Sequence, residues 1–264
     1  MIDAKTSIYG LIGKNISYSL SPKIHNFLFE YYKINAVYLV FDANFNENDF
    51  NNFIKKCQKI KTIKGFNITI PYKEYAGKFL EQKKEFNIAN CIKFNEKISA
   101  FNTDSYGFKK AVREKLNFDF YKKNILIYGA GATAKSIIYA IIDEVNKIFV
   151  INRNKKKAEE LKKISRKIYT EIDNLNEIEL VINATSVDLN IDYSKFKNNC
   201  CFFDVKYLNT YFIENAIKNN FKAINGMWML IYQAVKSFEL WTGIKVEEKL
   251  IEKIYRGLNE KNKR

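Results

Sequence analysis

The chain has 264 residues, 47% of them hydrophobic, which is enough for two α/β domains of ordinary size with apolar cores. No apolar run, Ile137–Ile142 included, is long enough to cross a membrane, and the N-terminus lacks the apolar core of a signal peptide. The net charge is +15, but the basic residues are mostly lysines spread over the whole chain. A nucleic-acid-binding protein would concentrate this charge in a stripe with arginine and aromatic residues, so the charge indicates a compositional bias.

The four cysteines, Cys57, Cys91, Cys200 and Cys201, show no Cys-x-x-Cys spacing. This argues against a zinc site and against a disulfide framework. We therefore expect no metal, a reducing cytoplasmic environment, and neither a membrane nor a nucleic acid as partner. The sequence leaves a monomer and a homodimer equally open.

Short strand-like runs alternate with helical runs from the N-terminus onward. The pattern predicts strands at 7–12, 37–41 and 65–68, a strand pair at 89–94 and 98–101, and helices at 22–33, 47–59, 72–81 and 105–116. This alternation is typical of α/β proteins with mostly parallel sheets and helices on both faces.

Residues 117–124 interrupt this rhythm and predict a domain junction. After the junction the pattern predicts strands at 125–128, 148–151, 180–183 and 201–204, and a helical region from residue 226 onward. We therefore expect two α/β domains, with a ligand bound between them. The first covers residues 1–116, with C-terminal helices of about 227–264 returning to it, and the second covers 117–226.

A glycine turn follows the predicted strand at 125–128. Gly129 permits a tight turn, Gly131 lets the backbone approach a pyrophosphate, and Ala134 allows close packing of helix and strand. The pyrophosphate would then bind the free N–H groups at a helix N-terminus. The sequence thus predicts a Rossmann-like dinucleotide site formed by Gly129, Ala130, Gly131, Ala132, Thr133 and Ala134.

The end of the next predicted strand indicates which dinucleotide binds. NAD-selective folds usually carry Asp or Glu there to hold the ribose 2′-hydroxyl group. This chain carries a run without any carboxylate instead: Asn152, Arg153, Asn154, Lys155, Lys156 and Lys157. Cations are disfavoured at the positive end of a helix, so this cluster favours the 2′-phosphate of NADP(H) as its partner.

Four polar segments lie outside the glycine turn: 13–26, 65–73, 101–107 and 226–243. Single features have ordinary explanations: Ser21 and Pro22 match an N-cap and a first helical position, and Thr103 and Asp104 match helix caps. His25, the single histidine, is expected to brace the first helix together with Asn26 and not to act as an acid or base.

Taken together and in order, these segments, with Ala89-Asn90 and the glycine turn, resemble the shikimate dehydrogenase family from position 13 to 243. The shared patterns include S-x-S-P-x-x-H-N, G-x-N-x-T-x-P-x-K, N-T-D-x-x-G, N-A-T-S and a C-terminal M-L-x-x-Q-A. The resemblance implies NADPH-dependent reduction of 3-dehydroshikimate to shikimate, a step in aromatic amino acid biosynthesis.

The resemblance also implies residue roles. Lys73 and Asp104 would be the catalytic pair, and Ser19 and Ser21 would bind the substrate carboxylate. The ring hydroxyls would be bound by Thr69, Asn90, Gln233 and Tyr207, and the nicotinamide end of the cofactor would lie against Val205 and Gly226. This chemistry is reasonable, because an ammonium group can donate a proton to the developing alkoxide and stabilise its charge.

Several positions depart from the family pattern. Tyr18 replaces a common histidine, Cys91 a threonine, and Ala132 a glycine, while Val187-Asp188 stand where a glycine is frequent. The segment after Tyr207 is shortened. Two other readings remain open: an enzyme that also accepts quinate or NAD, and a non-catalytic protein that binds nucleic acid through its basic surface.

Overall fold

The chain divides into two units in the computed structural model, which describes residues 2–82, 87–208 and 210–261. Unit 1 comprises Met1–Thr103 and Gln233–Arg264, and unit 2 comprises Asp104–Tyr232. This division falls earlier than the sequence-predicted junction at 117–124, because helix α4 (Thr103–Lys115) belongs to unit 2 from Asp104 onward. The ring of Phe108 in α4 packs edge-on against Phe203 in the sheet of unit 2, with centroids 5.2 Å apart.

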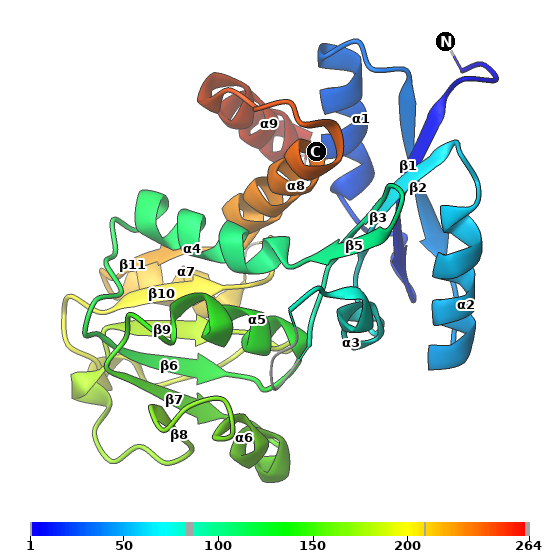
Figure 1. Cartoon of the computed structure of the whole chain (residues 1–264). Helices are drawn as coiled ribbons and strands as arrows, with labels where there is room; N and C mark the ends of the chain where they lie inside the picture. Colours follow the sequence, from blue (N-terminus) through cyan, green and yellow to red (C-terminus); the bar gives the residue numbers. More distant parts are fainter. Residues whose placement is uncertain (1, 83–86, 209, 262–264) are drawn as a thin grey trace. The chain divides into compact units, whose positions relative to one another are not determined.

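Unit 1 is built on a mixed five-stranded sheet in the order β2-β1-β3-β4-β5 (Figure 1). Its strands are β1 (Ser7–Gly13), β2 (Ala36–Asp42), β3 (Ile63–Ile68), β4 (Cys91–Phe94) and β5 (Ile98–Phe101). Strand β1 is parallel to β2 and β3, whereas β4 is antiparallel to β3 and β5. The short link between β4 and β5 allows only a hairpin, because a parallel pair needs a long crossover connection.

Helices α1 (Ser21–Tyr31), α2 (Glu47–Gln58) and α3 (Lys73–Ala76) complete the first part of unit 1. The prediction of one helix over 72–81 is wrong, since α3 gives way to a 3-10 turn at Gly77–Phe79 and Leu80 is extended. The change falls at Gly77, where a Cβ atom would lie 2.0 Å from the carbonyl oxygen of Asn87. The chain at Gly77 thus passes closer to another backbone segment than any residue with a side chain permits.

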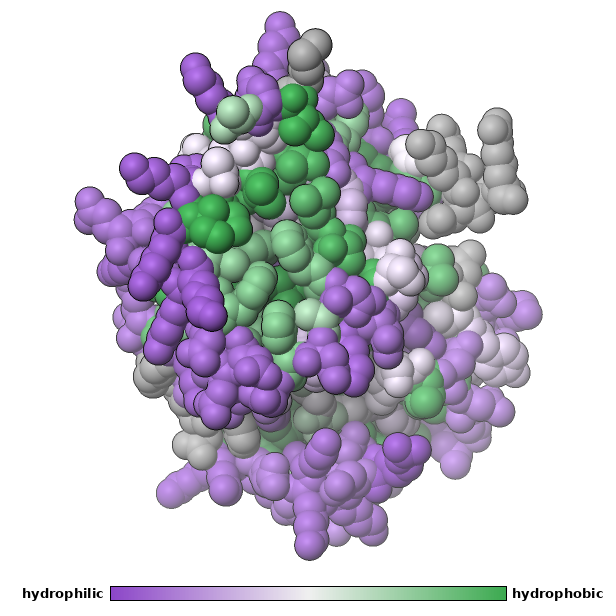
Figure 2. Space-filling model, turned by 90° about the vertical axis from the view of Figure 1, so that its right-hand side faces the viewer, coloured by the Kyte–Doolittle hydropathy of each residue, from purple (hydrophilic) through white to green (hydrophobic). Residues whose placement is uncertain are grey.

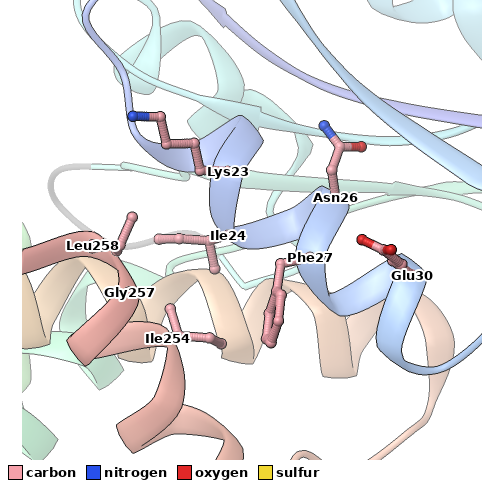
Figure 3. Close-up of a pocket in the computed structure, with 8 residues that line it drawn as sticks. All are labelled: Lys23, Ile24, Asn26, Phe27, Glu30, Ile254, Gly257 and Leu258. Carbon is pink, nitrogen blue, oxygen red and sulfur yellow. The ribbon is translucent and has the colours of Figure 1, made fainter. Parts of the chain in front are cut away.

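The C-terminal part of unit 1 consists of α8 (Met227–Thr242), from Gln233 onward, and α9 (Glu248–Lys261). Gly243 ends α8 with a φ of +76°, and its N–H donates to the carbonyl oxygen of Glu239 at 2.8 Å. Helix α9 lies beside α1, and the groove between them is lined by Ile24 and Phe27 of α1 and Ile254 and Leu258 of α9 (Figure 3).

Strand β2 forms one edge of the unit 1 sheet, and the Asn26 side chain of α1 binds this edge. The Asn26 amide accepts a hydrogen bond from the backbone N–H of Tyr38 at 2.8 Å and donates one to its carbonyl oxygen at 3.0 Å. Asn26 therefore takes the place that a neighbouring strand would occupy at Tyr38. Beyond it, Leu39 and Val40 are 43% and 39% exposed. Figure 2 views the side of unit 1 that carries β2 and shows apolar side chains gathered there.

Unit 2 contains a six-stranded sheet in the order β11-β10-β9-β6-β7-β8, in which every pair is parallel. Its strands are β6 (Asn124–Tyr128), β7 (Lys147–Ile151), β8 (Ile168–Tyr169), β9 (Leu180–Asn183), β10 (Cys201–Asp204) and β11 (Lys222–Ile224). The helices besides α4 are α5 (Ala132–Ile141), α6 (Lys155–Leu161) and α7 (Tyr211–Lys218). This is the Rossmann-like arrangement that the alternating sequence pattern predicts, and in the described part of the chain no helix is long and apolar enough to span a membrane.

The imidazole of His25 is fully buried in unit 1, between α1 and the sheet. Its ring stacks on that of Tyr38 with centroids 4.3 Å apart, and neither ring nitrogen completes a hydrogen bond with a described residue. Burial lowers the pKa of His25 to about 3, because the charged form loses its water, and the nearby Asn67 opposes this shift only weakly. His25 is therefore a neutral packing residue, in agreement with its predicted structural role.

We expect the buried neutral His25 to make the stability of the chain depend on pH. Between about pH 6.5 and 3 the unfolded chain binds a proton that the folded chain rejects, so the free energy of unfolding should decrease as the pH falls. For this one group the loss between pH 7 and 5 is about 2 kcal/mol. Urea unfolding of the wild type and of His25→Gln at both pH values measures it, since the chain contains one histidine. An equal loss in both proteins would contradict this prediction.

Candidate active site

Two segments at the carboxyl ends of β1 and β3 carry three hydroxyl residues in unit 1. Ser19 and Ser21 lie between β1 and the first turn of α1, and Thr69 follows β3. The Thr69 N–H donates to the carbonyl oxygen of Ile12 at 2.9 Å, and the Lys14 N–H donates to that of Ile70 at 3.1 Å. Gly13 makes this contact possible, because a Cβ atom there would lie 2.5 Å from the Thr69 methyl group. The three hydroxyl residues thus lie at the edge of the sheet where ligands bind in α/β folds.

Ser21 does not cap α1, contrary to the sequence-based interpretation. The helix begins at Ser21, its N-cap position is Leu20, and no side chain caps its N-terminus. The Ser21 N–H instead donates to the Ser19 hydroxyl oxygen at 3.2 Å. The two serines therefore form one hydrogen-bonded group at the start of α1.

Lys73 is the first residue of α3 and is only 8% exposed. Its backbone carbonyl oxygen accepts a hydrogen bond from the Ala89 N–H at 3.1 Å, which ties α3 to the segment that carries Asn90. On the other side, the Tyr72 N–H donates to the Thr69 carbonyl oxygen at 2.9 Å. The local chain thus holds Lys73 between two other predicted site residues, with its side chain largely shielded from solvent.

The Asn90 side chain is the centre of a buried hydrogen-bond network in unit 1. Its amide oxygen accepts from the Thr103 N–H at 2.6 Å, and its amide nitrogen donates to the Gln233 side-chain oxygen at 3.3 Å. These contacts join residues that are 143 positions apart in the sequence. The structure therefore brings together Asn90 and Gln233, both predicted to bind ring hydroxyls.

Sequence reasoning missed Asn67 and Ser237, which complete this network. The Asn67 amide nitrogen donates to the Asn90 carbonyl oxygen at 3.1 Å and to the Ser237 hydroxyl oxygen at 2.8 Å. Its amide oxygen accepts from the Tyr38 hydroxyl group at 2.9 Å. A signal was present in the sequence, because Ser237 follows Gln233 by one helical turn and thus faces the same way. Asn67 thus links Tyr38 of β2 to the Asn90 network.

Asp104 follows Thr103 at the start of α4 and is the first residue of unit 2. The residue is 6% exposed. The preceding residue is fixed in unit 1, because the Thr103 hydroxyl group lies 3.1 Å from that of Ser237. The predicted catalytic aspartate is therefore the second residue of α4, directly after Thr103, which is part of the buried network.

The glycine turn of unit 2 has the geometry that a dinucleotide requires. Gly129 has a φ of +114°, and a Cβ atom there would lie 2.8 Å from the Ala184 carbonyl oxygen, so only glycine fits. Gly131 is the N-cap residue of α5, and a Cβ atom there would meet nothing within 4 Å. Ala134 is fully buried against the sheet. The open space at Gly131, in front of free helix N–H groups, fits a pyrophosphate.

The cationic run lies just after β7, the strand next to β6. Asn154 caps α6 by accepting a hydrogen bond from the Lys157 N–H at 3.3 Å, and the Asn152 amide nitrogen donates to the Asn154 carbonyl oxygen at 2.9 Å. The first turn of α6 contains no acidic residue. The whole run from 153 to 157 is exposed. These side chains are therefore accessible to an anion, and their charges fit a 2′-phosphate group.

Val205 and Gly226 meet at the carboxyl end of β10. The Gly226 N–H donates to the Lys206 carbonyl oxygen at 2.8 Å, and a Cβ atom at Gly226 would lie 2.2 Å from the Val205 carbonyl oxygen. Tyr207, half-buried, lies in the same loop. Unit 2 thus groups the residues predicted to contact the cofactor, and the described residues contain no cluster of His, Cys, Asp and Glu that could hold a metal ion.

Comparison with known proteins gives the same family along the whole chain. The shikimate dehydrogenase substrate binding domain matches residues 11–103, shikimate/quinate 5-dehydrogenase matches 110–199, and the shikimate 5′-dehydrogenase C-terminal domain matches 226–254. The shikimate dehydrogenase (NADP(+)) of Aquifex aeolicus is 33% identical over 98% of this chain and 99% of its own length. That of Methanococcus vannielii is 37% identical over 93% and 94%, respectively.

Solved structures agree with these relatives. The crystal structure of the Aquifex aeolicus shikimate dehydrogenase has a TM-score of 0.86 and 31% identity, covering 97% of this chain and 100% of that one. A shikimate dehydrogenase solved in complex with NADP+ has a TM-score of 0.84 and 30% identity, covering 97% of both chains. On its motifs, its fold and these relatives, the chain belongs to the shikimate dehydrogenase family.

Proposed function

We propose that this chain catalyses the reversible, NADPH-dependent reduction of 3-dehydroshikimate to shikimate. The observation that carries the proposal is the buried polar network of unit 1, in which Asn90 and Gln233 converge beside the segment that holds Lys73. Such a convergence of satisfied polar groups suits a small polyhydroxylated acid. The membership of the chain in the family supports the choice of substrate.

The substrate is bound chiefly by unit 1 in this proposal. The hydroxyl groups of Ser19 and Ser21 donate hydrogen bonds to its carboxylate, as suits two hydroxyl groups held together at the start of α1. The ring hydroxyls bind Thr69, Asn90 and Gln233, with Tyr207 as a further contact from unit 2. Asn90 and Gln233 are already held by hydrogen bonds within the network. These two side chains are therefore preorganised, and they lose little conformational entropy when the substrate binds.

The cofactor is bound by unit 2. NADPH supplies the hydride that reduces the ketone carbon. The turn from Gly129 to Ala134 binds its pyrophosphate, and the run from Asn152 to Lys157 binds its 2′-phosphate. Val205 and Gly226 lie against the nicotinamide.

The proton comes from the chain. The Lys73 ammonium donates a proton to the oxygen of the ketone as that oxygen becomes an alkoxide, and its charge stabilises the oxygen before transfer is complete. Asp104 orients the ammonium group and accepts a hydrogen bond from a ring hydroxyl. In the reverse direction the neutral amine of Lys73 takes the proton back, so the same pair serves oxidation of shikimate.

A cytoplasmic location is part of the proposal. All four cysteines are buried and free, and burial raises the pKa of Cys57 to about 11. Unpaired buried thiols of this kind are typical of proteins from reducing compartments.

Replacement of Lys73 by alanine tests the proton donor. We expect kcat for shikimate oxidation to fall by about 100-fold or more, the usual contribution of a positioned acid or base. The absorbance of the reduced nicotinamide on mixing shikimate and NADP measures the rate. Lys78→Ala is the matched control, since this lysine of the same unit is 59% exposed and pairs with Glu47. A Lys73→Ala protein with the control's turnover would exclude Lys73 as the donor.

Replacement of Arg153 by alanine tests the choice of cofactor. We expect KM for NADP to rise by about 10- to 100-fold, because a charge-assisted bond to phosphate contributes about 1.5–3 kcal/mol, while KM for NAD stays constant. Arg166→Ala, an exposed arginine of the same unit, is the control. Wild-type rates with NAD equal to those with NADP would refute our interpretation of the cationic run. The same assay with quinate decides whether the substrate range is broader.

A further inference from the structure

Two neighbouring loops of unit 2 are tied together at the carboxyl ends of β9 and β10. Asn183 and Asp204 end these strands and pair in register, and the Val205 N–H donates to the Asn183 carbonyl oxygen at 3.0 Å. The Asn183 amide nitrogen also donates to the Val187 carbonyl oxygen at 3.1 Å. The loop before Leu189 is therefore fixed to the strand end from which Val205 and Tyr207 follow.

Asp204 binds the backbone and side chains of the second loop, which follows β10. Its fully buried carboxylate accepts hydrogen bonds from the Lys206 N–H at 2.9 Å, the Thr210 hydroxyl group at 2.9 Å and the Asn183 amide nitrogen at 3.1 Å. Burial raises the pKa of Asp204, although these hydrogen bonds oppose the change. The carboxylate thus joins positions 206 and 210, on either side of Tyr207.

Asp188 binds the end of the same loop, where α7 begins. Its carboxylate accepts hydrogen bonds from the N–H groups of Tyr211 at 2.8 Å and Phe212 at 3.1 Å, the first two residues of α7. The Lys206 ammonium lies 3.7 Å from this carboxylate and donates to the Val187 carbonyl oxygen at 3.1 Å. Partial desolvation raises the pKa of Asp188, but these hydrogen bonds and the lysine charge outweigh it and lower the pKa overall.

We propose that Asp188 and Lys206 are positioning residues that fix the loop carrying Val205 and Tyr207, and so set the affinity of the site for its substrate. The inference rests on the proposed function, which gives Tyr207 its contact with a ring hydroxyl. Asp188 and Lys206 form an ion pair that joins the two ends of the loop: Lys206 directly precedes Tyr207, and Asp188 binds the start of α7.

The test compares Asp188→Ala and Lys206→Met with a matched control, Asp192→Ala. Asp192 is another aspartate of unit 2 that caps a helical turn, accepting from the Ser194 N–H at 3.1 Å, and it does not contact the loop. We expect Asp188→Ala and Lys206→Met each to raise KM for shikimate by about 10-fold, while kcat changes less than about 3-fold. Asp192→Ala should leave KM unchanged, although it too loses a cap.

A second measurement does not depend on turnover. Amide hydrogen exchange at residues 205–208 should become faster in Asp188→Ala than in the wild type, and not in Asp192→Ala. If Asp188→Ala keeps the wild-type KM and the wild-type exchange at 205–208, the proposal is wrong. A wild-type protein that does not oxidise shikimate would overturn the proposed function, and hydrogen exchange would still decide whether Asp188 holds the loop.

Discussion

The mutual satisfaction of buried polar side chains around Asn90 is the constraint on which the candidate site depends. An unpaired buried amide costs about 1–3 kcal/mol, so Asn67, Asn90 and Gln233 are stable in the interior only because each completes the hydrogen bonds of another. These residues come from β3, the position just before β4, and α8. The hydrogen bonds that stabilise these polar groups in the core are therefore the same ones that hold the predicted substrate-binding side chains in place.

Much of this could be predicted from the sequence, and the remainder has physical causes. The long periodic elements and the Gly129 turn were predictable, because their signals are local. Strands β8 and β11 contain two and three residues, too few for a pattern to form. Gly77 lies against the backbone of Asn87, and Asn67 hydrogen-bonds Ser237, which is 170 positions away. Such facts depend on tertiary packing, which no local pattern contains.

The departures from the family pattern have different structural roles. Cys91 is fully buried in β4, where a small apolar side chain suits the packing. Ala132 begins α5 directly after Gly131, and the Ser136 hydroxyl group donates to its carbonyl oxygen at 3.0 Å. Tyr18 is 70% exposed, so its replacement of a histidine changes the surface beside Ser19 and not the core. None of these residues removes a group that the proposed chemistry needs.

The bond between Asn26 and the edge of β2 has a consequence for the behaviour of the chain in concentrated solution. Residues 36–41 of this strand carry no charge, and an uncharged apolar edge is a template on which another chain can add a strand. The Asn26 amide occupies the backbone groups of Tyr38 in the middle of that edge. The Asn26 side chain thus leaves less of the backbone of this edge free to pair with another chain. The helix that begins with Ser21 therefore also protects the sheet edge at Tyr38 from the addition of a strand.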